Sequence, residues 1–440
     1  MANTLKYGSG VWATKKGSSL AYNDQDDNYK PLPFTADRAS TATRVNKEGL
    51  IEVVGQDKLR IDYTDSTKGV ALLEPVRRNL VLRSEELDNG AWIKLANTTV
   101  TANQITAPDG TNNADEMSAT ATSTSLIAVQ DAHTVTASTD YVVSFFAKKG
   151  DIRYVQLFHG SGQVSDNPRT NFDLEDGVVS AESSNHDSSM VDYGNGWYRC
   201  ITKLTTFSVT NLQIYINGVA TSNAARSATN SWTAGDDFYV WGVQLEDGGA
   251  GVGATYPTSY IPTSGSSVTR VADTANGAGN SEVFNDSEGV LYVNAAALNN
   301  DGTFRTFSIN NGATTNSILI GYANTSNKVI AETKVAGTKV QTNTVAVASA
   351  LDFNKMAIKY KLNDYSLYVN GFELATDTSA SVPTGLDELD IDRGDGVIPF
   401  YGKTKEVKVY DTALSDTDLE YLTSYRSLTE MATELNLNTL

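Results

Sequence analysis

An acidic run near the end of the chain has the spacing that a glycoside hydrolase would need. In GLDELDIDRGDG the carboxylates of Glu388, Asp390 and Asp392 alternate, so on a β-strand all three would point to one face. Retaining hydrolysis requires two carboxyl groups about 5 to 5.5 Å apart, and residues two apart on one strand face come near that separation. The same run could instead be a solvent-facing acidic strand, or bind a metal weakly through Asp390, Asp392 and Asp395. We favour these two alternatives over catalysis, because the C-terminal part of the chain has no tryptophan on which a sugar could stack.

Two aromatic residues beside turns are candidates for binding a glycan without cleaving it. Trp232 stands in the loop NSWTAGDD, and Tyr193 precedes a glycine turn. Sugars stack their C–H faces on exposed aromatic rings, while their hydroxyls bond to Asp, Asn, Gln and Arg. Aromatic residues at such positions also pack into cores. Trp232 and Tyr193 are therefore the candidate glycan contacts, although residues of this kind more often pack into a core than bind a ligand.

A segment near the N-terminus partly matches a calcium-binding loop. Asp24, Asp26 and Asn28 fit the first three ligand positions of a helix-loop-helix calcium site. The match then fails, because the sixth position is Tyr29 instead of Gly and the twelfth is Thr35 instead of Glu. A solvated acidic turn is the better interpretation, and we expect no cofactor apart from a structural Ca²⁺ that this segment could hold.

The remaining reactive side chains are sparse. His133, His159 and His186 are dispersed, without a His-x-x-x-His or Cys-rich partner, so the sequence does not support a zinc site. The single cysteine, Cys200 in GWYRCITKL, excludes an intrachain disulfide and reads as a small apolar core residue.

Charge and hydropathy limit the classes of partner. The chain has 34 basic and 52 acidic residues, a formal net charge of -18, which repels phosphate backbones and disfavours nucleic-acid binding. No run of about 18 apolar residues and no signal-type apolar segment occurs, so we expect neither membrane insertion nor export. At 440 residues, rich in Gly, Tyr, Thr, Ser and Asn, the chain suggests several all-β domains.

The elements that position the candidate residues begin with a module at 79–250. Short strand-like runs at regular spacing, among them AWIKL, DYVVSFFAKK and LQIYING, predict a jelly-roll β-sandwich. The segment GNGWYRC resembles a glycine turn that leads into a tryptophan-containing strand in a known protein family, and this resemblance implies that Trp197 lies in the core. Asn217-Gly218 is expected to be a two-residue hairpin turn, because both residues tolerate positive φ.

The last strand of this module, FYVWGVQLE, leads into a predicted linker at 251–281. Alternation puts Tyr239, Trp241, Val243 and Leu245 on one face, so Trp241 is expected in a core strand. The linker has prolines five residues apart in YPTSYIPTSG, and each proline forces an extended conformation on its predecessor. We therefore predict that this linker is stiff and that it fixes the angle between the two modules.

A second module is expected at 282–425, followed by a tail at 426–440. Asn370-Gly371 lies between two alternating runs, which is a strong hairpin signal. Ser415, with Asp418 three residues on, predicts the start of a short helix. The tail has helical spacing and could form a terminal helix that docks on a neighbouring subunit.

A short internal sequence repeat suggests that the same type of connection between domains, here called a joint, occurs twice. ATRVNKEGLIEV and VTRVA with SEGVLYV each carry Thr-Arg-Val, then Glu-Gly, then an alternating strand. Arg44 and Arg270 would then occupy equivalent places and tie a linker to a neighbouring domain, unless the repeat is due to chance. Residues 1–78 are expected to form an extended N-terminal attachment region.

Several of these segments together resemble one family. VWGVQLEDG with YPTSYIPTSGSSVTRVAD, GNGWYRC, RASTATRV, GLIE, LLEP and RNL are similar to segments of tailed-bacteriophage virion structural proteins. In that family a carbohydrate-binding-module-like jelly roll precedes a concanavalin A-like or laminin-G-like domain, whose hairpin the Tyr-Val-Asn-Gly segment resembles. The concanavalin A-like fold includes β-glucanases with Glu-x-Asp-x-Glu on a strand. Here the third acid is Asp392, which is one methylene shorter.

The resemblance implies a non-enzymatic virion protein of the head-fibre, decoration or tail-fibre type. It implies capsid or tail proteins as partners, a homo-oligomer, expected to be a trimer, and weak attachment to host-surface or environmental glycans. A polysaccharide hydrolase or depolymerase, and a purely architectural protein without ligand, remain the alternatives.

Overall fold

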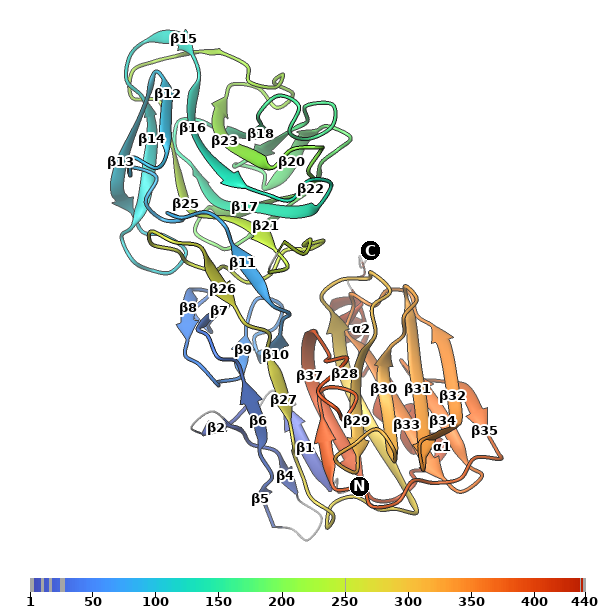
Figure 1. Ribbon diagram of the computed structural model, residues 1–440. Helices are drawn as coiled ribbons and strands as arrows, with labels where there is room; N and C mark the ends of the chain where they lie inside the picture. Colours follow the sequence, from blue (N-terminus) through green and yellow to red (C-terminus); the bar gives the residue numbers. More distant parts are fainter. Residues whose placement is uncertain are drawn as a thin grey trace. The chain divides into compact units, whose positions relative to one another are not determined.

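The computed structural model describes residues 4–8, 12–15, 18–23, 28–249, 251–435 and 437. The chain divides into two compact units, each assembled from separate stretches of sequence. Unit 1 comprises Met1–Thr41, Val54–Pro75 and Ala272–Leu440, and unit 2 comprises Ala42–Val53 and Val76–Val271. Strands form almost all the regular structure of both units (Figure 1), which confirms the all-β prediction.

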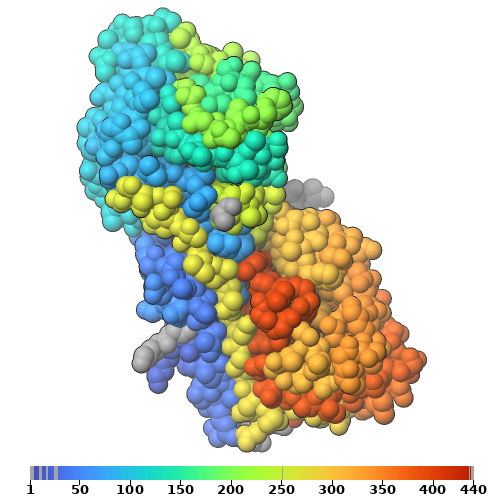
Figure 2. All heavy atoms as spheres, viewed as in Figure 1, coloured from blue at the N-terminus to red at the C-terminus, as the bar shows by residue number. Residues whose placement is uncertain are grey.

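Unit 2 is a sandwich of two antiparallel sheets whose facing sides share one apolar core. The first sheet runs, in spatial order, through β13 (Thr98–Ile105), β14 (Ala114–Ala119), β25 (Asp237–Asp247), β17 (Asp140–Lys149), β22 (Trp197–Thr205) and β21 (Asp187–Asp192), with β11 (Arg77–Asn79) between β25 and β26 (Val268–Arg270). The second runs through β12 (Ile93–Ala96), β16 (Ile127–Thr134), β23 (Asn211–Val219), β18 (Tyr154–His159), β19 (Arg169–Asp173) and β20 (Val178–Glu182). Two small pairs complete the unit, β7 (Ala42–Val45) with β8 (Ile51–Val54) and β15 (Ser123–Ser125) with β24 (Asn230–Trp232). Figure 2 shows one face of this unit, most of it coloured cyan to green.

The strand β25 does not keep the alternation that its sequence suggests. Phe238 and Val240 point into the main core, and so do Val243 and Leu245, whereas Trp241 packs on the other side. A β-bulge causes the change of face: three residue steps on β25 oppose two on β17. Gly242 lies at the bulge with φ +62°, a conformation that favours glycine. The predicted single apolar face is therefore wrong beyond Trp241.

The segment after β25 is held along unit 2 by side chains of that strand. Gln244 accepts a hydrogen bond from the backbone nitrogen of Ile261 at 2.6 Å, and Glu246 accepts one from that of Thr258 at 3.1 Å. The ring of Tyr260 packs 4.7 Å from that of Trp241. Much of the predicted linker is therefore a bound strap whose backbone donors are satisfied by buried side-chain acceptors.

Unit 1 is also a sandwich, with its core between a ten-stranded and a five-stranded sheet. The larger sheet runs through β35 (Phe372–Asp377), β34 (Tyr365–Val369), β33 (Asn354–Lys361), β28 (Glu288–Ala297), β37 (Gly402–Tyr410), β1 (Leu5–Gly8), β4 (Tyr22–Asn23) and β5 (Lys30–Pro31), with β10 (Val70–Leu73) between β37 and β9 (Arg60–Asp62). The smaller runs through β32 (Thr338–Ala346), β31 (Lys328–Val335), β30 (Ser317–Tyr322), β29 (Arg305–Asn310) and β36 (Glu388–Asp390). A four-stranded sheet contains β2 (Thr14–Lys15), β3 (Ser18–Ser19), β6 (Phe34–Asp37) and β27 (Thr274–Asn276).

The start of the chain belongs to the sheet of unit 1, which differs from the separate region expected at 1–78. Leu5 pairs with Val409 across β1 and β37, and Ala71 of β10 pairs with Thr404 of the same strand. Leu5 and Tyr7 are buried in the unit 1 core. Pairing of this kind satisfies the backbone groups that an open sheet edge would leave to solvent.

Local signals predicted some turns and caps correctly and one turn wrongly. Asn370 and Gly371, with φ of 51° and 88°, join β34 to β35 as expected. Ser415 caps α1 (Asp416–Thr423) by accepting from the nitrogen of Asp418, and the tail forms α2 (Leu428–Glu434). Asn217-Gly218 is not a turn, because both residues lie inside β23 and pair with β16 and β18. Among the described residues, no helix has the length and apolar run needed to cross a membrane.

Candidate functional site

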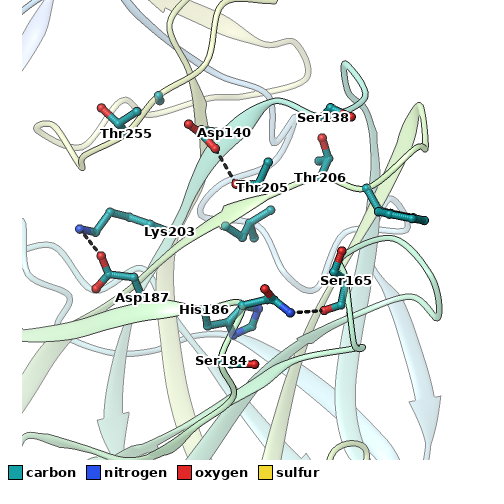
Figure 3. A pocket seen from close by; sticks show the side chains of 14 residues that line it. Ser138, Asp140, Ser165, Ser184, His186, Asp187, Lys203, Thr205, Thr206 and Thr255 are labelled. Atoms are coloured by element: carbon teal, nitrogen blue, oxygen red, sulfur yellow. Dashed lines mark hydrogen bonds and ion pairs between the residues drawn. The ribbon is translucent and has the colours of Figure 1, made fainter. Parts of the chain in front are cut away.

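A polar hollow in unit 2 is the site best suited to bind a ligand. It encloses about 560 Å³ and lies where the end of β22 meets the start of β17 and the turn before β21. Figure 3 shows Lys203 paired with Asp187 on one side of the hollow, and Asp140 with Thr205 on another. The segments that meet here are far apart in the sequence but adjacent in the sheets.

The polar side chains of this hollow are held in place by hydrogen bonds and an ion pair within the protein itself. The Nζ of Lys203 lies 2.6 Å from Oδ2 of Asp187, its register partner on β21. Thr205 donates to Oδ1 of Asp140 at 2.6 Å, and Oδ2 of Asp140 makes no hydrogen bond to a described residue. Asn185 donates to the carbonyl oxygen of Ser165 at 3.0 Å. Fixed donors and acceptors lose little freedom when they bind a ligand.

His186 adds a buried imidazole to the lining. Its side chain is 6% exposed, and its Nδ1 lies 2.8 Å from Oγ1 of Thr170. Its Nε2 has no hydrogen-bond partner among the described residues. Burial, with a smaller effect of the neighbouring His159, lowers the pKa of His186 to about 2, so the ring is neutral. A neutral imidazole can exchange a hydrogen bond with a ligand without adding charge.

Phe207 supplies the apolar surface of the hollow. The residue is 53% exposed although it is a large aromatic. Its backbone nitrogen donates to the carbonyl oxygen of Gln163 at 2.9 Å, and its own carbonyl oxygen accepts from the nitrogen of Ser138 at 3.0 Å. Because both backbone polar groups of Phe207 are hydrogen-bonded, its exposed ring is held in place and can stack against the apolar face of a ligand.

The arrangement suits a neutral, polyhydroxylated ligand. One apolar ring lies beside hydroxyl, amide, imidazole and carboxylate groups, which together offer both donors and acceptors. The charged lining residues are Asp140, Asp187 and Lys203, so the hollow carries a slight negative charge and would disfavour an anion.

The two predicted glycan contacts lie elsewhere in unit 2. Trp232 is 6% exposed, packs in the main core and donates from Nε1 to the carbonyl oxygen of Ser125 at 3.0 Å. Its ring is therefore not open to a sugar, because the β15–β24 pair turns it inward. Tyr193 is half-buried, edge-on to Phe146 at 4.9 Å, and lines a second hollow of about 440 Å³ together with Trp197. Its role as a glycan contact stays a prediction.

Of the four residues expected to be structural, three are buried and Arg44 is partly exposed. Trp197 and Trp241 are 2% and 1% exposed and belong to one hydrophobic cluster. Arg270 is buried, and its Nη1 donates to Oγ of Ser259 at 2.9 Å. Arg44 is partly exposed and pairs with Glu52 across the β7–β8 hairpin. The two arginines therefore differ in burial, and their equivalence as joints stays a prediction.

The acidic run of unit 1 does not present three free carboxylates. Asp390 accepts from the backbone nitrogen of Gly277 at 2.6 Å and from Asn310 at 2.8 Å. Asp392 accepts from Asn276 at 2.6 Å, and Asp395 pairs with Arg393 at 2.6 Å. Burial raises the pKa of Asp390 and of Asp392.

No group of three or more potential metal-ligating His, Cys, Asp or Glu side chains occurs in the part of the chain that the structure describes. The contacts of Asp390, Asp392 and Asp395 are instead those of a hydrogen-bonded structural segment. The predicted calcium-type positions Asp24 and Asp26 lie outside the described residues. Cys200 is buried in the core, as its sequence context suggested, and burial raises the pKa of its thiol.

The sequence did not reveal Phe207 or the histidine pair. Phe207 follows a strand and precedes Ser208, and an aromatic residue leaving a strand into a polar loop is the one local signal that marks it. His159 and His186 are 27 positions apart by number, yet their rings lie 5.2 Å apart at an edge-to-face angle. That proximity depends on the second sheet and the β20–β21 turn.

Comparisons with known proteins give no family. No family model matches the sequence, and no curated protein matches it. Among solved structures, the CBM40 of a Ruminococcus gnavus IT-sialidase bound to alpha2,3 sialyllactose is 21% identical, with a TM-score of 0.29, over 34% of this chain and 94% of that chain. The leech intramolecular trans-sialidase is 23% identical, with a TM-score of 0.27, over 32% of this chain and only 24% of that chain. Domains LG4-5 of the mouse laminin alpha1 chain are 10% identical, with a TM-score of 0.23, over 70% of this chain and 90% of that chain. TM-scores this low establish no relationship for the whole chain.

Proposed function

We propose that this protein is a non-enzymatic glycan-binding protein that displays the hollow beside Phe207 on a bacteriophage virion. The observation that carries the glycan part is the exposed Phe207 ring, fixed by two backbone hydrogen bonds beside a hollow of polar groups. A sugar ring has an apolar C–H face and polar hydroxyl groups. The Phe207 ring can contact the first, and the oriented polar groups of the hollow can bind the second.

The ligand class is a neutral saccharide. The protein has a formal net charge of -18, and the hollow itself holds two carboxylates against one ammonium group. Both features oppose the approach of an acidic glycan. A shallow polar site binds one sugar weakly, so several copies on a symmetric particle would supply the avidity.

The virion setting is supported by the sequence resemblance to tailed-phage structural proteins. This resemblance also implies a head-fibre, decoration or tail-fibre position, contacts with capsid or tail proteins, and a homotrimeric state. Native mass spectrometry of the purified protein tests the trimer. Immunogold labelling of intact particles tests the location, and absence of label from every particle component would contradict it.

A glycan array tests the binding function. We expect neutral glycans to bind the wild-type protein and binding to fall about tenfold or more in Phe207→Ala. Phe372→Ala is the matched control, because Phe372 is an exposed aromatic of unit 1, 70% exposed, and should leave array binding intact. Equal binding by the wild type and Phe207→Ala would exclude this hollow. Release of reducing ends from laminarin or agar would contradict the non-enzymatic part.

A further inference from the structure

Unit 1 contains its own polar hollow, of about 660 Å³, on the outer face of the ten-stranded sheet. The hollow lies over a row of directly paired residues on three strands: Lys355 of β33, Asn294 of β28 and Glu406 of β37. Directly opposite residues of antiparallel strands project from the same face. Leu291, Val293 and Ala295, the alternate residues of β28, face the core, so Asn294 points outward into the hollow.

A β-bulge adds a further group to this row. The register of β28 and β37 shifts between Asn294 and Ala295, where Lys405 is the extra residue of β37. Because of the bulge, the consecutive residues Lys405 and Glu406 both line the hollow. The C-terminal helix α2 forms another wall, where Glu434 accepts from Nζ of Lys405 at 2.7 Å.

Two buried acceptors in this hollow have no donor among the described residues. Asn294 is 6% exposed, and its Oδ1 makes no hydrogen bond. The Oε2 of Glu434 is likewise buried and without a partner, although Oε1 is bound by Lys405. A buried acceptor left without a donor costs free energy, so each of these atoms favours a ligand that brings a donor.

The buried and partly buried charges of the hollow are balanced by neighbours, whereas the lining residue Lys68, which is in no ion pair among the described residues, is exposed. Lys355 lies 2.6 Å from Glu430, Lys405 lies 2.7 Å from Glu434, and Glu406 lies 2.5 Å from Lys408. A ligand therefore has no need to supply a charge, and an anion would meet the two unpartnered acceptor oxygens. We propose that this hollow is a second binding site for a neutral, polyhydroxylated ligand of the hexose class, which donates hydroxyls to Asn294 and Glu434.

This site consists of unit 1 residues alone. It can therefore be tested independently of the hollow beside Phe207. The test uses full-length Phe207→Ala protein, so that binding at the first hollow is weakened. Methyl glucoside and methyl galactoside at millimolar concentration are the probes, sodium glucuronate is the charged comparison, and hydrogen exchange of residues 63–69, which line the hollow, is the readout.

We expect the neutral glycosides to protect residues 63–69, and glucuronate to protect them less. Asn294→Leu, which keeps the number and branching of side-chain heavy atoms but removes the acceptor, should weaken the effect about fivefold to tenfold. Thr433→Trp, at an exposed position of α2, should block the hollow without altering the sheet. Asn343→Leu is the control, because Asn343 has an unpartnered amide nitrogen outside the hollow.

Absence of protection by both neutral glycosides would overturn the proposal. Stronger protection by glucuronate than by methyl glucoside would also overturn it, because the ligand class would be wrong. Unchanged protection in both Asn294→Leu and Thr433→Trp would show that the probes bind elsewhere.

Discussion

Arg38 donates from Nη1 to Oδ1 of Asp273 across 2.7 Å, and both side chains are withdrawn from solvent. The second oxygen of Asp273 accepts from Arg60, which also pairs with Glu74 at 2.7 Å. These carboxylates raise the pKa of Arg60 despite its complete burial. The cluster joins the three separate stretches of unit 1, since Arg38 lies in the first, Arg60 in the second and Asp273 near the start of the third.

Asp273→Asn should therefore destabilise unit 1 strongly. Removing one member of a buried charge cluster leaves the others uncompensated, at a cost of about 3 to 5 kcal/mol. Urea unfolding followed by far-UV circular dichroism measures it. Asp395→Asn is the control, because its partner Arg393 is about one-third exposed and a surface pair contributes about 1 kcal/mol or less. Equal stability losses in the two variants would contradict the assignment.

Acidification should destabilise unit 2 through its histidine pair. Burial lowers the pKa of His159 to about 4 and that of His186 to about 2, below the ordinary value of 6.5. A group with a depressed pKa stabilises the fold above 6.5, and this stability is lost as the pH falls from 6.5 toward 4. The expected loss is of the order of 1 kcal/mol per histidine for each pH unit.

Tryptophan fluorescence during urea unfolding follows this change, because Trp92, Trp197, Trp232 and Trp241 all lie in unit 2. The double variant His159→Gln, His186→Gln should show a flatter dependence on pH. Comparing wild type with variant is necessary, since burial raises the pKa of Asp115 to about 6 and that group acts in the opposite direction. Parallel pH curves for the two proteins would contradict the prediction.

Gly242→Ala should destabilise unit 2 at the β25 bulge. A Cβ on Gly242 would lie 2.9 Å from the Phe146 ring, and φ of +62° is unfavourable for alanine. We expect a loss of about 2 kcal/mol or more in the free energy of unfolding. Gly90→Ala is the control, since a Cβ there meets nothing within 4 Å. A neutral Gly242→Ala would mean that the bulge relaxes freely.

The sequence predicted those features that short-range physics decides. The Asn370-Gly371 turn and the Ser415 cap follow from backbone preferences of a few neighbouring residues. Asn217-Gly218 carries the same turn signal, but strand pairing on both sides overrides it. Likewise the predicted alternation along β25 holds as far as Trp241, where a bulge opposite the partner strand changes the face.

The candidate site was less predictable because it is assembled from distant segments. The hollow beside Phe207 combines Asp140, the turn at His186 and the end of β22, and nothing in their spacing along the chain joins them. Trp232 had the residue type and loop context of a glycan contact, yet packing of the β15–β24 pair buries it. An aromatic residue in a loop indicates a ligand surface only once its exposure is known.

Hydrogen exchange of the full-length protein, with and without a neutral glycan selected on the array, tests the central claim most directly. We expect protection at residues 184–187 and 203–207, which line the hollow, and its loss in Phe207→Ala but not in Phe372→Ala. Binding of a glycan without protection of these two segments would contradict the claim that this hollow is the glycan-binding site.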